Sequence, residues 1–182
     1  MPDSVRWVAS LGGVLIVIPV SVVNLWTGST PTGRLGGTGE TIDDYDRACA
    51  IHDYAALITV GESGTQALVL GDEPSTTCYL PEHRCFLRLY YADDEDELIA
   101  DAKATLAHDA IEWQECGIWE TDGPAVLMDS VYSGLDLVVP NPDGVLPDQA
   151  PISLGAGRWT VRAARIEHDR NGMDLIQLLP VG

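Results

Sequence analysis

"LGGVLIVIPVSVVNLW", residues 11–26, is the most apolar stretch of the chain. A helix that crosses a bilayer needs about 20 apolar residues, whereas this run is shorter and is interrupted by Pro19 and Asn24. No clearly basic segment precedes it and no small-x-small cleavage site follows it, which argues against a secretory signal. We therefore expect a buried strand over 14–18 and a short helix from Pro19 to Gly28. This interpretation predicts a cytoplasmic protein with no membrane partner.

The composition predicts one domain of 182 residues with a packed core, because 46% of the residues are hydrophobic. The formal net charge is -18, from 10 Lys and Arg against 28 Asp and Glu. Such a field repels nucleic acid and anionic lipid, and it attracts basic partners. Two interpretations follow from the charge alone: a basic protein partner, or acidity that only maintains solubility.

Local patterns predict many short antiparallel strands with two or three short helices, an α+β fold dominated by sheet. We expect hairpins that pair residues 56–61 with 66–71, 77–80 with 85–91, and 158–167 with 173–180. Residues 111–120 alternate apolar and polar positions, and residues 124–131 are their predicted partner strand.

Helix signals are clearest at residues 92–108, where Asp93 or Asp94 serves as the cap, acids fill the first turn and His108 suits the C-terminal end. A shorter helix follows the cap Thr41 or Asp43. The Gly- and Thr-rich residues 27–40 predict a mobile loop without a nucleotide-binding motif, and residues 141–151 predict a loop rich in Pro, Gly and Asp.

The two halves of the chain, residues 1–92 and 111–182, resemble each other weakly. Trp7 with Gly12 and Gly13 before "VLIVI" resembles Trp119 with Gly123 before "AVLM". Glycines after Ile58 and after Ile152 precede a strand in the same order in both halves. We interpret this similarity as an old duplication that gave two similar β modules packed together within residues 1–182.

Motifs for catalysis, metal binding or cofactor binding are absent from the sequence. Cys49 and His52, together with Cys78, His83 and Cys85, can be written as a zinc set, but they lack the paired short spacings of structural zinc sites. The aspartate clusters lack the glycine-centred loop of a calcium site. We therefore predict no cofactor, no metal and no enzymatic activity, with Cys78 and Cys85 as free thiols close together across a hairpin.

Several motifs in a fixed order resemble the immunity protein 21 family, whose members are antidotes encoded beside polymorphic toxins in bacteria. The most specific are the Trp-x4-Gly-Gly opening at Trp7, Asp44-Tyr45-Asp46-Arg47 and Leu70-Gly71-Asp72-Glu73-Pro74. The resemblance covers nearly the whole chain. It implies a single-domain, mostly β protein that binds a cognate toxin domain and does not catalyse a reaction.

Two acidic clusters are the candidate partner-binding residues, because few Lys or Arg lie near them in the sequence. Their members are Asp43, Asp44, Asp46, Asp93, Asp94, Glu95, Asp96 and Glu97. The alternative interpretation is that both clusters are helix starts whose carboxylates serve the helix dipole. We predict an immunity protein that neutralises a basic toxin domain such as a nuclease. Two other classes remain open: a small carboxylate- or metal-dependent hydrolase, and an acidic structural or regulatory protein.

Overall fold

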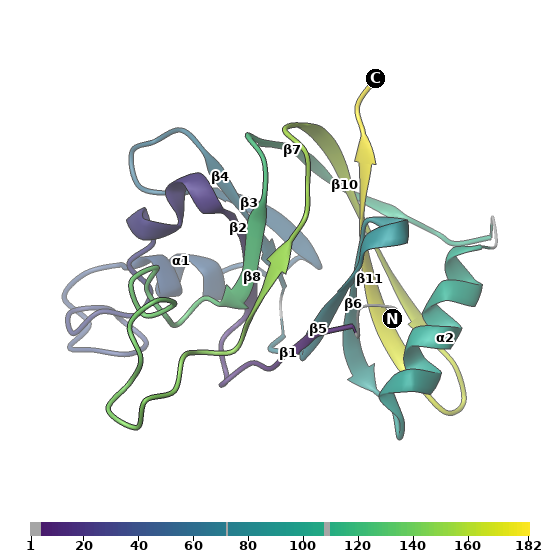
Figure 1. The fold of residues 1–182 in the computed structure, drawn as a ribbon, viewed down its shortest axis with the longest axis horizontal. Coiled ribbons are helices and arrows are strands. Elements are labelled where there is room, and N and C mark those ends of the chain that lie inside the picture. Colours follow the sequence, from purple (N-terminus) through teal and green to yellow (C-terminus); the bar gives the residue numbers. More distant parts are fainter. Residues whose placement is uncertain (1–4, 72, 108–109) are drawn as a thin grey trace.

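Two antiparallel sheets lie face to face in the computed structural model, which describes residues 5–71, 73–107 and 110–182 (Figure 1). The six-stranded sheet has the order β1-β5-β6-β11-β10-β7 and the five-stranded sheet has the order β3-β4-β2-β8-β9. The strands are β1 (Trp7–Val8), β2 (Leu15–Pro19), β3 (Ala55–Thr59), β4 (Gln66–Leu70), β5 (Thr77–Leu80), β6 (Cys85–Tyr91), β7 (Gln114–Thr121), β8 (Ala125–Asp129), β9 (Gln149–Ile152), β10 (Gly157–Glu167) and β11 (Gly172–Pro180). The helices are the 3₁₀ segments η1 (Val20–Leu25) and η2 (Pro81–His83) and the α-helices α1 (Asp44–Cys49) and α2 (Glu95–Leu106).

Strand β2, the middle of the opening apolar stretch, is the central strand of the five-stranded sheet. It pairs with β4 on one side and with β8 on the other, and all five of its residues are buried. Leu15 and Val17 pack between the two sheets, whereas Ile16 and Ile18 pack on the opposite face of their own sheet. A strand buried on both faces needs apolar residues at every position, which explains why this stretch does not alternate.

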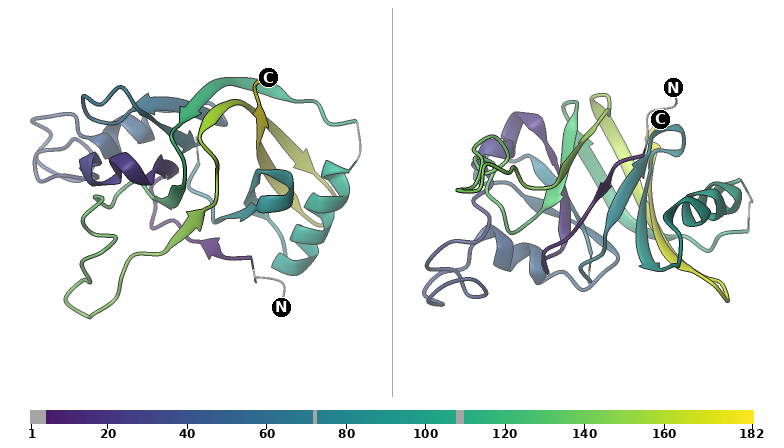
Figure 2. Two further views of the ribbon diagram at one scale, coloured as in Figure 1. Left: turned by 45° about the horizontal axis from the view of Figure 1, so that its top comes forward. Right: turned by 60° about the horizontal axis from the view of Figure 1, so that its bottom comes forward.

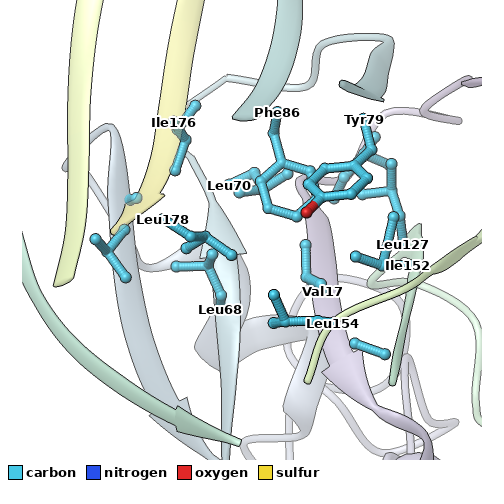
Figure 3. Packing of buried hydrophobic residues seen from close by; sticks show 14 of the residues in the cluster. Val17, Leu68, Leu70, Tyr79, Phe86, Leu127, Ile152, Leu154, Ile176 and Leu178 are labelled. Carbon is cyan, nitrogen blue, oxygen red and sulfur yellow. The ribbon is translucent and has the colours of Figure 1, made fainter. Parts of the chain in front are cut away.

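The core between the sheets is formed by alternate residues of the strands that face each other (Figure 3). Val17, Leu68 and Leu127 come from the five-stranded sheet, and Phe86 and Ile176 come from the six-stranded sheet. The exposed fraction of each of these five side chains is 0%. Burial of apolar surface on this scale is the main favourable contribution to folding.

Each sheet is also covered on its outer face, so the fold has four layers (Figures 1 and 2). On the five-stranded sheet, Val22 and Trp26 from η1 and the residue after it pack with Ala48 of α1. On the six-stranded sheet, Leu98 and Ala102 of α2 cover a second apolar face. No helix of the described residues has both the length and the apolar character that crossing a membrane requires.

Most of the locally predicted elements are confirmed. The three expected hairpins are β3–β4, β5–β6 and β10–β11, and α2 begins after its cap Asp94. The predicted helix from Pro19 to Gly28 is instead the 3₁₀ segment η1, with Pro19 as the last residue of β2. His108, the predicted helix end, lies outside the described residues.

The predicted pairing of residues 111–120 with 124–131 is wrong. Strand β7 pairs with β10 at the edge of the six-stranded sheet, whereas β8 lies between β2 and β9 in the other sheet. The chain crosses from one sheet to the other at Gly123, where φ is +151°. The burial patterns agree with this separation, because β8 is buried at every position and most of β7 is not.

The strand order has an approximate internal symmetry. In the six-stranded sheet, β6, β5 and β1 of the first half, counted outward from the centre, correspond to β11, β10 and β7 of the second half. In the five-stranded sheet, β2 and β4 correspond in the same way to β8 and β9. Strand β7 lies against β3 and β4, and β1 lies against β8 and β9, so each half packs on strands of the other. The Trp7 and Trp119 motifs precede equivalent crossings in this order, but Ile58 in β3 and Ile152 in β9 are not equivalent. The duplication itself stays a prediction.

Substitution of Leu15 tests the role of β2 in the core between the two sheets. Leu15→Ala leaves a cavity in the core, so we expect the free energy of unfolding to fall by about 2–5 kcal/mol. Leu11→Ala is the matched control, because Leu11 is 74% exposed whereas Leu15 is 1% exposed, and it should change stability by less than about 0.5 kcal/mol. Urea denaturation measures both values, and equal effects of the two substitutions would contradict this role.

Candidate partner-binding surfaces

The first acidic cluster forms the N-terminus of α1 and is buried. Asp43 is the N-cap: its carboxylate accepts a hydrogen bond from the Asp46 N–H at 2.9 Å, and the Asp46 carboxylate accepts one from the Asp43 N–H at 3.0 Å. This reciprocal pair is a capping box. Asp43, Asp44 and Asp46 are 7%, 8% and 7% exposed, so these carboxylates do not project a patch into solvent.

The same three carboxylates hold the loop of residues 27–40 against α1. Asp44 accepts from the N–H and hydroxyl of Thr27, and Asp43 accepts from the N–H and hydroxyl of Thr30. Asp46 accepts from two further backbone N–H groups, those of residues 34 and 35. The predicted mobile loop is therefore tied down by side chains that lie after it in the sequence.

Close packing and hydrogen bonding define the surroundings of these carboxylates. A Cβ atom at Gly33 would lie 1.8 Å from an Asp43 oxygen, so a larger residue there would displace the Asp43 carboxylate. Burial raises the pKa of Asp46, but its backbone hydrogen bonds outweigh that effect, and the net pKa is below the usual value. Asp44 forms an ion pair of 2.9 Å with Arg47. The oxygens of this cluster are thus occupied within the chain, and a partner-binding role for it stays a prediction.

The second acidic cluster, Asp93 to Glu97, opens α2 and is exposed at all five positions. Asp94 caps the helix by accepting from the Glu97 N–H at 2.8 Å. Glu97 lies 3.7 Å from Arg170 in a pair whose side chains are 66% and 81% exposed, so solvent screens that attraction. The structure therefore separates the two clusters, with one buried beside the five-stranded sheet and the other exposed on the far side of the six-stranded sheet (Figure 1).

The candidate zinc residues lie on different faces of the molecule. Cys49 packs on the outer face of the five-stranded sheet, whereas Cys78 and Cys85 lie beneath α2 on the six-stranded sheet. Cys78 pairs with Leu87, and Cys85 pairs with Leu80, so the two thiols are diagonal neighbours on one face. All four cysteines are free. Burial raises the pKa of Cys78 to about 12 and also raises that of Cys85, which suppresses thiolate chemistry.

A buried ionic cluster lies at one end of the six-stranded sheet. Asp174 accepts from Arg165 at 2.7 and 3.0 Å and lies 3.5 Å from Arg88. Arg165 also lies over the rings of Tyr54 and Tyr90. The buried Asp174 carboxylate thus pairs with two guanidinium groups, as a charge in the interior requires opposite charge and hydrogen bonds around it. Among the described residues, no group of three or more His, Cys, Asp or Glu side chains could hold a metal ion.

A broad groove of about 1330 Å³ lies beside β8 and β9, on the opposite side of the molecule from α2. We call it the β8–β9 groove. One wall is the connection between these strands, which extends away from both sheets at the lower left of Figure 1. Its lining is mostly apolar and includes Leu11, Val20, Val138, Val139, Val145 and Leu146. The sequence predicts only a loop over residues 141–151, although Val145 and Leu146 among its prolines are a signal of an apolar surface.

A family model, immunity protein 21, matches residues 6–172. The match includes the capping box, the whole five-stranded sheet and the connection between β8 and β9, and it ends at the first residue of β11. The chain belongs to the immunity protein 21 family. This membership confirms the resemblance found in the sequence, and it gives the chain an immunity role with a toxin protein as partner. Neither the curated proteins nor the solved structures contain a match to this immunity protein 21 chain.

Substitution of Asp43 tests the structural role of the buried cluster. Asp43→Ala leaves the Asp46 and Thr30 N–H groups without their acceptors, so we expect a loss of about 2 kcal/mol in the free energy of unfolding. Asp93→Ala removes an exposed carboxylate and should change stability by less than about 0.5 kcal/mol. Urea denaturation compares the two variants. An Asp43→Ala protein as stable as Asp93→Ala would show that the loop does not depend on this carboxylate.

Proposed function

We propose that this chain binds and neutralises a cognate effector domain of a polymorphic toxin in the cytoplasm, without catalysis. The toxin domain in this proposal is basic, as a nuclease domain is. Family membership supports the immunity role. The specific class of toxin rests on electrostatics, because the partner of so acidic a surface should carry the opposite charge.

The main support for this proposal is that most of the acidic side chains of the chain have no basic side chain of the same chain to neutralise them. The ion pairs among the described residues join seven basic side chains to six carboxylates, whereas the whole chain has 28 acids. The α2 cluster alone presents five exposed acids, and only Glu97 forms an ion pair among the described residues. The basic residues are thus largely engaged within the chain, and excess carboxylates face solvent.

An acidic surface of this kind acts on association more than on dissociation. Complementary long-range fields can raise association rates by about 10–1000-fold, and salt reduces the effect. Rapid capture suits an inhibitor that must intercept a toxin before the toxin reaches its target. In this proposal the exposed acids at the start of α2 attract the toxin domain at long range. They need not each contact it in the complex.

Two alternatives have less support in the geometry. For a carboxylate-dependent hydrolase, Asp43 and Asp46 of the capping box offer a pair of carboxylates, but their oxygens already accept backbone hydrogen bonds. A general base needs a free oxygen within reach of its substrate. For a protein whose acidity serves only solubility, charge removal should leave partner binding unchanged, which the following experiment measures.

Removal of the α2 charges should slow binding of the toxin domain encoded by the neighbouring gene. The variant D93N/E95Q/D96N/E97Q keeps the Asp94 cap. We expect its association rate to fall by roughly 3–10-fold at low ionic strength, with a flatter salt dependence and a smaller change in dissociation rate. Stopped-flow or surface-based kinetics at two ionic strengths provide the measurement.

The matched control is E62Q/E112Q/E115Q/E167Q, which removes the same charge from dispersed, exposed positions. It should slow association less than the α2 variant does. Equal slowing in both variants would assign steering to total charge instead of to α2. Unchanged association in both would contradict a basic toxin domain, and failure of the unmodified chain to bind or inhibit the toxin would contradict the immunity proposal itself.

A further inference from the structure

The β8–β9 groove exposes more large apolar side chains than folding alone explains. Val138 is 73% exposed, Val139 is 60% exposed and Leu11 is 74% exposed, and all three line the groove. Val20 and Val145, at 52% and 59%, line it as well. Single exposed apolar residues are ordinary, but a contiguous group in a concave surface is typical of an interaction site.

The wall of this groove is held in place by hydrogen bonds, while the side chains of Val138 and Val139 in it stay exposed. The Asn141 side chain accepts from the N–H groups of residues 143 and 145 at 3.0 and 2.9 Å. The Gln149 side chain donates to the Leu137 carbonyl at 3.0 Å, and Asp136 accepts from Ser133. A surface that is already ordered loses little conformational entropy when it binds.

The charge around the groove is negative, with two carboxylates against one guanidinium. No Lys or Arg occurs between Lys103 and Arg158, so the whole connection between β8 and β9 lacks basic residues. Asp136 and Asp148 line the groove. Arg6 lines it too, but it lies 3.8 Å from Asp148 and is paired with that carboxylate. The groove thus offers apolar contacts with an acidic rim.

The edge of the five-stranded sheet next to the groove is not suited to strand addition. Strand β9 is the edge strand, it has only four residues, and Pro151 within it has no N–H to donate. Pro151 also lines the groove. Recognition at this place therefore depends on side chains that enter the groove and not on a new backbone ladder.

From these four observations we infer that the β8–β9 groove is the docking site for a segment of the toxin domain with apolar side chains flanked by Lys or Arg. The apolar side chains of that segment fill the groove, and its basic residues meet Asp136 and Asp148. This inference rests on the proposed function, since it names the surface through which the immunity protein holds its toxin. The acids of α2 lie on the opposite side and act at longer range.

The test measures binding of the purified toxin domain from the neighbouring gene. The variant V138S/L146S removes apolar contacts from the groove, and L35S/I42S is the matched control. The control positions are 61% and 57% exposed, and those in the groove are 73% and 44% exposed. The groove variant should bind at least about 30-fold more weakly, mainly through faster dissociation, because two interface anchors are lost. The control should stay within about threefold of the unmodified chain.

The rim is tested by D136N/D148N, which keeps acceptor oxygens for Ser133 and for the Ala9 N–H. It should slow association at low salt with a smaller effect on dissociation. Unchanged kinetics would overturn the assignment of a basic segment. Circular dichroism and thermal unfolding verify that each variant is folded, as expected for exposed positions.

Three results separate the possible failures. Tight toxin binding by the unmodified chain together with equally tight binding by V138S/L146S would overturn the docking site and leave the proposed function intact. Absence of toxin binding by the unmodified chain would overturn both. Sedimentation that shows a dimer for the unmodified chain and a monomer for V138S/L146S would identify a second copy as the occupant and would also overturn the inference.

Discussion

Burial of β2 on both faces is the constraint on which the rest of this structure depends. Leu15 and Val17 need the six-stranded sheet opposite them, and Ile16 and Ile18 need a cover on the other side. That cover is built from η1, α1 and the chain around them, so these irregular segments are as necessary to the core as the strands are. The capping box and the loop hydrogen bonds of Asp43, Asp44 and Asp46 follow from this requirement, because they fix α1 and residues 27–40 in place.

The acidity of the chain therefore has two different uses. Some carboxylates are consumed inside the molecule, as in the capping box and in the contact of Asp174 with Arg88 and Arg165. Others are exposed and give the surface its field, with α2 as the densest group. The β8–β9 groove lies on the other side of the fold and combines apolar lining with an acidic rim. We thus propose that long-range attraction and short-range contact with the toxin use different surfaces of one immunity protein.

Elements whose signal is local can be predicted from the sequence. The apolar run at β2, the turn between β10 and β11, and the acids that open α2 each determine a nearby element. Arrangements that depend on residues far apart in the sequence cannot be predicted in this way. Strands β7 and β8 are adjacent in sequence, but Gly123 leads them into different sheets. The burial of Asp43 depends on Thr30, and the groove brings Leu11 beside Val138, more than 100 residues later. Neither arrangement can be deduced from composition or periodicity.

Hydrogen–deuterium exchange of this chain, alone and in complex with the toxin domain of the neighbouring gene, can locate the surface that binds the toxin. We expect the strongest added protection on residues 134–148, the wall of the β8–β9 groove, with little change at the start of α2. Protection concentrated elsewhere, for example over residues 27–40, with exchange at residues 134–148 unchanged, would contradict this expectation.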